Sequence, residues 1–206
     1  MKSMPVLFCA MLLAPLLTLR SAWGTETAPD TLVKSTTEEV LAVIRHSTDP
    51  PQLVEVAEAK VVPHFDFERM TRLAVGRGWH QASPQQQQTL QKEFHTLLVR
   101  TYAHVLASSK NKEVQLALSP LRAPAGNNDE VTVRTQVSAG GEKPVAIDYQ
   151  MEKSPAGWKV FDVAVDGISL VTSYRQSFSD EIGKSGIEGL IKVLAAKNRD
   201  RREIRR

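Results

Sequence analysis

The sequence predicts an α+β domain, with a curled antiparallel sheet of about four strands covered by helices. Apolar residues recur every three or four positions between residues 36 and 107, and again between 168 and 194, as in amphipathic helices. Between these regions, over residues 114–165, the apolar period changes to two, which is typical of strands. Strands between two blocks of helices favour a sheet with helices packed on one face.

Caps and breaks predict the N-terminal helices. Ser35-Thr36-Thr37-Glu38 fits a capping box and is expected to start the first helix, which Asp49-Pro50-Pro51 ends. A second helix should end before Pro63. Asp66 can cap a short third helix, which closes on the turn Gly76-Arg77-Gly78-Trp79.

The longest helix is predicted after Ser83, a good N-cap, and Pro84, which suits the first helical position. Its apolar stripe ends around Ser108-Ser109. Two further helical stripes follow the strands, and Gly183 and Gly186 punctuate the pair.

Three strands, at 114–118, 131–137 and 145–151, alternate apolar and polar residues, so each should have one buried and one wetter face. The fourth run, 158–165, is apolar at most positions, so we expect it to be evenly buried and central.

Residues 1–24 read as a cleaved signal peptide, with Lys2, an apolar run of 14 residues (6–19) and small residues at Ala22 and Gly24. A membrane-spanning helix needs roughly 20 apolar residues, so this run is too short to be an anchor. Cleavage would leave one domain at 25–198 and a basic tail at 199–206, and would remove Cys9, the only cysteine. The mature protein is therefore expected to have no disulfide.

The charge pattern argues against nucleic-acid binding. Without residues 1–24, 24 basic and 23 acidic residues remain, a net charge of +1. Residues 197–206 carry six basic and two acidic residues, which leaves a body of about −3 at 25–196. A nucleic-acid-binding surface would instead gather Lys and Arg on one face.

No catalytic or metal-binding motif is present in the sequence. The five histidines form no H-E-x-x-H motif, and Gly183-Lys184-Ser185 lacks the remaining glycine of a phosphate-binding loop. A carboxylate inside an apolar pocket could act as a base, which leaves a cone-fold enzyme acting on a small apolar substrate as an alternative. We expect instead that Asp148 and Asp162 face water and that Asp166-Gly167 forms a turn.

Several motifs resemble those of the MlaC-type phospholipid-binding proteins, also called the toluene-tolerance family. They are DFERMTRLAVGRGW (66–79), EFHTLLVRTYA (93–103), IDY (147–149), GWKVFDVAVDGISLVTSYRQSF (157–178) and GIEGLI (186–191). The resemblance spans roughly residues 40–198 and keeps the order and spacing of the motifs.

The resemblance implies a nuclear-transport-factor-like cone with extra helices and an apolar pocket. It also implies a soluble periplasmic carrier without enzymatic activity, whose cargo is phospholipid and which needs no cofactor. Its partners would be an inner-membrane ABC transporter complex with an MCE component and an outer-membrane lipoprotein–porin complex, and its role would be to maintain outer-membrane lipid asymmetry. We expect a monomer. A general binder of apolar solutes is the other alternative.

The predicted pocket combines the inward faces of the strands with residues of the long helix, the third helix and the C-terminal helices. Gly76 and Gly78 could permit hinge motion, and Arg100 and Arg175 are candidates for headgroup contacts. The predicted lining comprises Met70, Leu73, Trp79, Leu98, Tyr102, Val105, Val131, Val133, Val145, Ile147, Tyr149, Val163, Val165, Val171, Tyr174 and Phe178.

Overall fold

The computed structural model describes residues 27–46, 49–107, 114–119, 129–141 and 143–203. The predicted signal peptide and the predicted helix end at Ser108-Ser109 lie outside these ranges. The helices are α1 (Pro29–His46), α2 (Pro50–Val56), the π-helical η1 (Ala57–Val61), the 3-10 helix η2 (Val62–His64), α3 (Phe67–Val75), the 3-10 helix η3 (Gly76–His80), α4 (Pro84–Ala107) and α5 (Leu170–Glu203). The strands are β1 (Val114–Leu118), β2 (Glu130–Ala139), β3 (Val145–Ser154), β4 (Gly157–Val165) and β5 (Ile168–Ser169).

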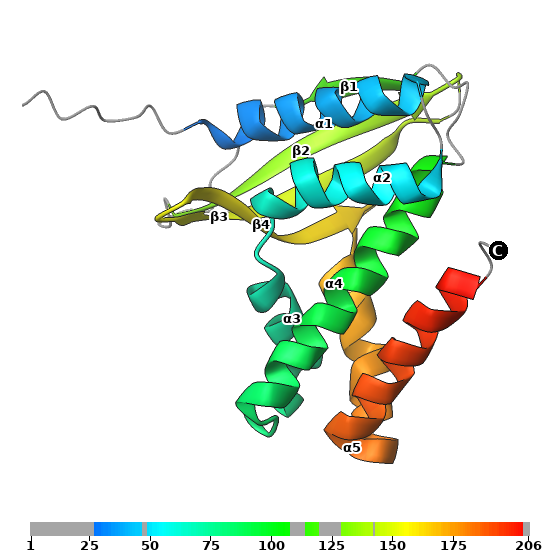
Figure 1. The fold of residues 1–206 in the computed structure, drawn as a ribbon. Coiled ribbons are helices and arrows are strands. Elements are labelled where there is room, and N and C mark those ends of the chain that lie inside the picture. The colour runs from blue at the N-terminus through cyan, green and yellow to red at the C-terminus, as the bar shows by residue number, and fades with distance from the viewer. Residues whose placement is uncertain (1–26, 47–48, 108–113, 120–128, 142, 204–206) are drawn as a thin grey trace, which may run out of the picture.

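The α+β fold class is confirmed. The five strands form one open sheet in the order β1-β2-β3-β4-β5, and all neighbours are antiparallel. Helix α1 lies against the sheet, and α2 packs on α1 and α4. Helices α3, α4 and α5 form a second helical layer that extends away from the sheet (Figure 1). The short fifth strand was not predicted.

Strand β4 is evenly buried, as expected, but it is not central. Its outer neighbour is only the two-residue β5, so β4 lies next to an edge of the sheet. Both faces are nevertheless covered. Val160 and Val163 pack in a cluster with α1, while Phe161 lies against Arg69 of α3, which explains why residues 160–164 are all buried.

The first helix begins earlier than predicted. Helix α1 starts at Pro29, a residue type that suits the first helical position, and Ser35 lies inside the helix with its hydroxyl donating to the Leu32 carbonyl at 3.2 Å. The capping-box prediction was therefore wrong. The second helix ends before Pro63, as predicted, because α2 ends at Val56 and η1 at Val61, while Pro63 belongs to the separate 3-10 helix η2. Pro63 is tolerated there because it stands in the first turn of η2, where its missing N–H is not needed.

The caps predicted for the third and fourth helices are confirmed, whereas only one of the two glycines predicted to interrupt the C-terminal helices, Gly186, does so. The Asp66 carboxylate accepts from the Arg69 amide at 2.8 Å and caps α3. At the start of α4, the Ser83 hydroxyl accepts from the Gln86 amide at 3.2 Å, and the Gln86 side chain accepts from the Ser83 amide at 3.0 Å. Helix α5 is broken at Gly186, which has φ 70° and ψ −175°.

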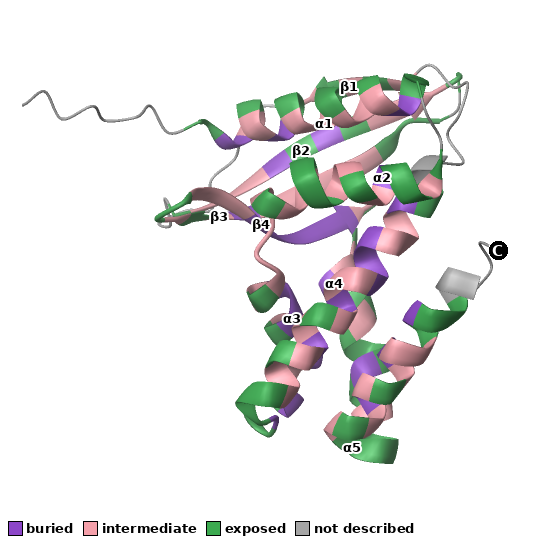
Figure 2. Cartoon of the chain, viewed as in Figure 1, coloured by how far each residue is buried: buried purple, intermediate pink, exposed green. Residues whose placement is uncertain are grey.

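Three buried clusters hold these elements together, and Figure 2 shows how the buried residues are distributed. The largest cluster lies within the α3–α4–α5 layer, where Phe94 packs edge-to-face on Phe178 at 5.2 Å. The second lies between the sheet and α1, and the third joins α1 and α2 to α4 through Ile44, Leu53 and Ala103. Buried Asn198 fixes the end of α5 by donating to the Glu93 carbonyl of α4 at 2.9 Å.

Candidate functional site

An apolar cavity of about 270 Å³ lies between α1 and the sheet. Its walls come from α1, from the η1–η2 segment and from strands β1 to β4. The lining residues are Leu32, Val33, Thr36, Thr37, Val40, Leu41, Ile44, Val61, His64, Phe65, Val114, Val137, Ala139, Ile147, Tyr149, Met151 and Val160.

The sequence patterns account for this lining. Alternation along β3 places Ile147, Tyr149 and Met151 on one face of the sheet. The stripe of α1, which includes Val33, Val40 and Ile44, then faces the same space because its members recur at helical spacing. Two amphipathic surfaces thus enclose one apolar volume.

The polar groups of the cavity are few and uncharged. Tyr149 is half-buried, and the side chains of Thr37 on α1 and Thr135 on β2 lie close to it. Burial raises the pKa of Tyr149, so its hydroxyl stays protonated at neutral pH. Burial and nearby Lys159 lower the pKa of His64 below its usual 6.5, so its imidazole is mainly neutral at pH 7. The described lining contains no Asp, Glu, Lys or Arg. Such a cavity suits an apolar ligand better than a charged one.

The structure separates the sixteen predicted pocket residues into groups. Ile147 and Tyr149 line the cavity, and Val131, Val133 and Val163 belong to the adjoining sheet–α1 cluster. Those on the helices pack in the core of the α3–α4–α5 layer, away from this cavity: Met70, Leu73, Trp79, Leu98, Tyr102, Val171, Tyr174 and Phe178. Burial there raises the pKa of Tyr102 to about 12.

Three valines of the predicted set lie in less buried positions. Val105 is 55% exposed and Val145 is 36% exposed, while Val165 is half-buried near the end of β4. Ligand contact by the sixteen residues stays a prediction. The prediction missed the α1 wall, because it included no residue of the first helix and placed the helix start after Leu32 and Val33.

The expectation that Asp162 faces water was wrong. Its side chain is buried and accepts hydrogen bonds from the Val163 amide at 2.8 Å and the Val171 amide at 3.1 Å. It also accepts from the Ser169 hydroxyl at 2.5 Å, so it caps the start of α5. Both oxygens of this carboxylate already accept hydrogen bonds from the protein, as in a structural helix cap.

The other two aspartates have structural contacts. Asp148 is half-buried and pairs with Arg134 across the β2–β3 ladder at 3.4 Å. Asp166 adopts φ 48° beside Gly167, as expected for a turn, and its carboxylate accepts from the Ala146 amide at 3.0 Å.

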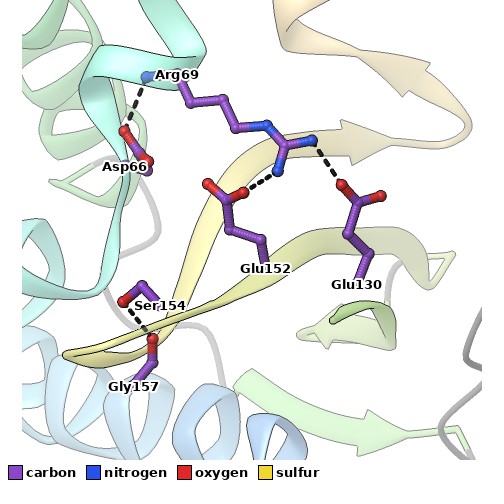
Figure 3. A network of polar contacts seen from close by, with 6 residues as sticks. All are labelled: Asp66, Arg69, Glu130, Glu152, Ser154 and Gly157. Carbon is purple, nitrogen blue, oxygen red and sulfur yellow. Dashed lines mark hydrogen bonds and ion pairs between the residues drawn. The ribbon is translucent and has the colours of Figure 1, made fainter. Parts of the chain in front are cut away.

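A polar network joins α3 to the sheet (Figure 3). The Arg69 guanidinium binds Glu130 at 2.8 Å and also Glu152, and it lies 3.5 Å from the centre of the Phe161 ring. The pKa of Glu152 is raised because burial and a hydrogen bond with Asp66 outweigh the opposing effect of Arg69. Arg69 thereby fixes the helical layer to one face of strands β2 and β3, and the other face of these strands borders the cavity.

Among the described residues, no cluster of His, Cys, Asp and Glu has the arrangement to hold a metal ion. Within the same ranges, no helix has the length and apolarity needed to cross a membrane.

Together, the open sheet, the covering helix and the uncharged cavity define an α+β protein with an apolar cavity as its candidate ligand-binding site. Residues 34–196 match the MlaC protein family, and the chain belongs to this family.

Three relatives support this assignment. The intermembrane phospholipid transport system binding protein MlaC of Haemophilus influenzae is 23% identical, over 81% of this chain and 80% of its own length. The toluene tolerance protein ttg2D of Pseudomonas putida is 24% identical, over 84% of this chain and 79% of its own. The phospholipid-binding protein from Ralstonia solanacearum, solved in complex with a phospholipid, is 39% identical and superimposes with a TM-score of 0.77, covering 85% of this chain and 99% of its own.

Proposed function

We propose that this protein is a periplasmic phospholipid carrier and that the cavity between α1 and the sheet receives acyl chains. The observation that carries the proposal is the uncharged, apolar lining, in a chain 39% identical to a protein solved with a phospholipid bound. Asp162, the one buried carboxylate considered for catalysis, is occupied as a helix cap, so the proposal includes no enzymatic step.

A carrier is needed because lipid crosses water poorly. Two acyl chains contain roughly 30 methylenes, and at about 0.8 kcal/mol for each, exposing them to water costs about 24 kcal/mol. A protein cavity of similar apolarity makes transfer from a membrane complex to the carrier nearly neutral in free energy. Modest docking energies can then control loading and release.

The cavity must enlarge to hold such a cargo. Its volume of about 270 Å³ is below the range of about 300–1,000 Å³ typical of small-molecule pockets. Helix α1 is the wall that can move, because its buried residues are only Pro29, Val33 and Ile44. We infer that loading displaces α1 from the sheet and separates Thr37 from Tyr149.

The proposed partners follow from the family. One is an inner-membrane ABC transporter complex with an MCE component, and the other is an outer-membrane lipoprotein–porin complex. Exchange of lipid between them would maintain the asymmetry of the outer membrane.

Filling the cavity tests the proposal. Ile147→Trp adds bulk to a cavity wall and should reduce extraction of a fluorescent phospholipid from vesicles by about tenfold, since added volume in a packed site costs about 1–3 kcal/mol. Ile168→Trp adds bulk at a position that is 66% exposed and outside the cavity lining, and it should leave extraction unchanged.

Thermal unfolding of both variants serves as the folding control. Normal extraction by a folded Ile147→Trp protein would show that lipid binds elsewhere.

A further inference from the structure

A second hollow is lined by residues of α3, of η3 and of the first part of α5. Helices α3 and α5 belong to the layer that extends away from α1 and the sheet (Figure 1). The volume of this hollow is about 940 Å³, compared with about 270 Å³ for the apolar cavity. The two hollows share no described lining residue. We call the second one the basic groove.

The basic groove concentrates positive charge. Arg72 of α3, Arg77 of η3 and Arg175 of α5 line it together with His80, and all four side chains are exposed. No Asp or Glu is among its described lining residues. This arrangement stands out because the chain from 25 to 196 carries a net charge of about −3.

The arginines are available to a ligand. Within the described part of the chain, Arg72 and Arg77 have no ion-pair partner. Arg175 donates from Nε to the Leu73 carbonyl at 2.8 Å, which ties its guanidinium to α3 and leaves its two terminal nitrogens for another acceptor.

The floor of the groove is apolar and closely packed. Leu73, Val75 and Ile182 contribute to it. At Gly78, a Cβ atom would lie 2.8 Å from Ile182 Cδ1 and 3.2 Å from Ile187 Cδ1, so η3 rests directly on α5. The groove is therefore formed by packed helices and is present before any partner arrives.

We propose that the basic groove docks an acidic segment of a partner protein that also carries apolar side chains. Carboxylates on the segment would pair with the arginines of the rim, and its apolar side chains would contact the floor, as in helix-in-groove recognition. A flat bilayer surface could reach the rim, but its headgroups would not fill a concave apolar floor. Charge complementarity of this type orients a partner and speeds its association. The proposal does not depend on the lipid cargo, because the groove and the cavity are separate.

The test uses a fluorescein-labelled amphipathic helical peptide built from Glu, Leu and Ala, titrated with the mature chain and followed by fluorescence anisotropy. Arg72→Glu/Arg77→Glu should weaken binding by about tenfold or more, because it replaces two attractive charge pairs with repulsive ones. Lys34→Glu/Lys192→Glu makes the same change in net charge at exposed positions outside the groove and should weaken binding by less than about twofold.

The proposal would be overturned if the arginine and the lysine double substitutions weakened peptide binding equally, or if the unmodified protein did not bind the peptide at all. Sedimentation with phosphatidylglycerol vesicles tests the alternative occupant of the groove, a membrane surface. The groove contacts membrane lipid instead if three results coincide. The unmodified protein binds the vesicles, the double substitution Arg72→Glu/Arg77→Glu abolishes that binding, and the peptide does not bind. Phospholipid extraction by Arg72→Glu/Arg77→Glu should remain normal, which separates failure of this proposal from failure of the carrier proposal.

Discussion

Arg69 shows how single residues couple the two layers of the molecule. Its amide donates to the Asp66 cap, and its side chain is the partner of two glutamates on the sheet. Arg69→Met should lower the free energy of unfolding by about 1–3 kcal/mol, because it leaves a partly buried carboxylate without its partner. Arg134→Met removes a more exposed pair with Asp148 and should cost about 0–1 kcal/mol.

The effect of Arg69→Met should depend on pH. Without the guanidinium, Glu152 keeps only the burial and the Asp66 contact, both of which raise its pKa above the ordinary 4.5. A raised pKa in the folded state means that the protonated form is favoured there, so stability falls as the pH rises through that value. Chemical denaturation at pH 5 and pH 8 should therefore show the larger loss at pH 8. Equal losses at both values, or a loss no greater than that of Arg134→Met, would contradict this role of Glu152.

Local signals predicted some residues well and others poorly, for a physical reason. The caps at Asp66 and Ser83 were predictable because each depends on the identity of residues within one helical turn. The burial of Asp162 was not predictable, because a prediction from alternating residues assumes that one face of the strand is exposed to water. In the structure, the start of α5 covers the face on which this carboxylate lies. Burial of both faces of β4 is decided by packing between segments distant in sequence.

At the scale of elements, two glycines of α5 differ in what they contribute. Gly186 has φ 70° and ψ −175°, a conformation that other residues rarely adopt, whereas Gly183 is helical. At both positions, an added Cβ atom would meet no other described atom within 4 Å. Gly186→Ala should therefore lower the free energy of unfolding by about 1–3 kcal/mol through backbone strain alone. Gly183→Ala should be neutral or stabilise by up to about 1 kcal/mol, as alanine does in helices.

Thermal denaturation of the two variants provides the comparison. If both substitutions have the same effect, the break in α5 does not depend on the backbone conformation of Gly186.

The choice of the helix that covers the apolar face of the sheet could not be predicted from the sequence. The apolar faces of β3 and of α1 were both recognisable from their periods, and Ile147 and Tyr149 were placed in the pocket from the strand pattern. Which helical layer covers that face was not recognisable, because both layers present amphipathic stripes. The prediction chose α4 and α5, whose stripes instead pack on each other.

At the scale of the whole molecule, the two hollows suggest a division of roles. The apolar cavity lies beneath α1, which is the element proposed to move, and the basic groove lies on the packed helical layer. Separation of cargo from docking would allow a partner to hold the carrier without occupying the lipid site. The ion pairs of Arg69 with Glu130 and Glu152 connect the helical layer to the sheet.

The carrier proposal depends on phospholipid bound in the cavity beneath α1. Its decisive measurement is the native mass of the mature protein, purified from its secretory compartment without detergent, together with lipid analysis of whatever it carries. We expect the mass of the polypeptide plus stoichiometric phospholipid, and a depleted lipid signal for Ile147→Trp. A bare polypeptide mass, or bound apolar molecules unrelated to phospholipid, would contradict the proposal.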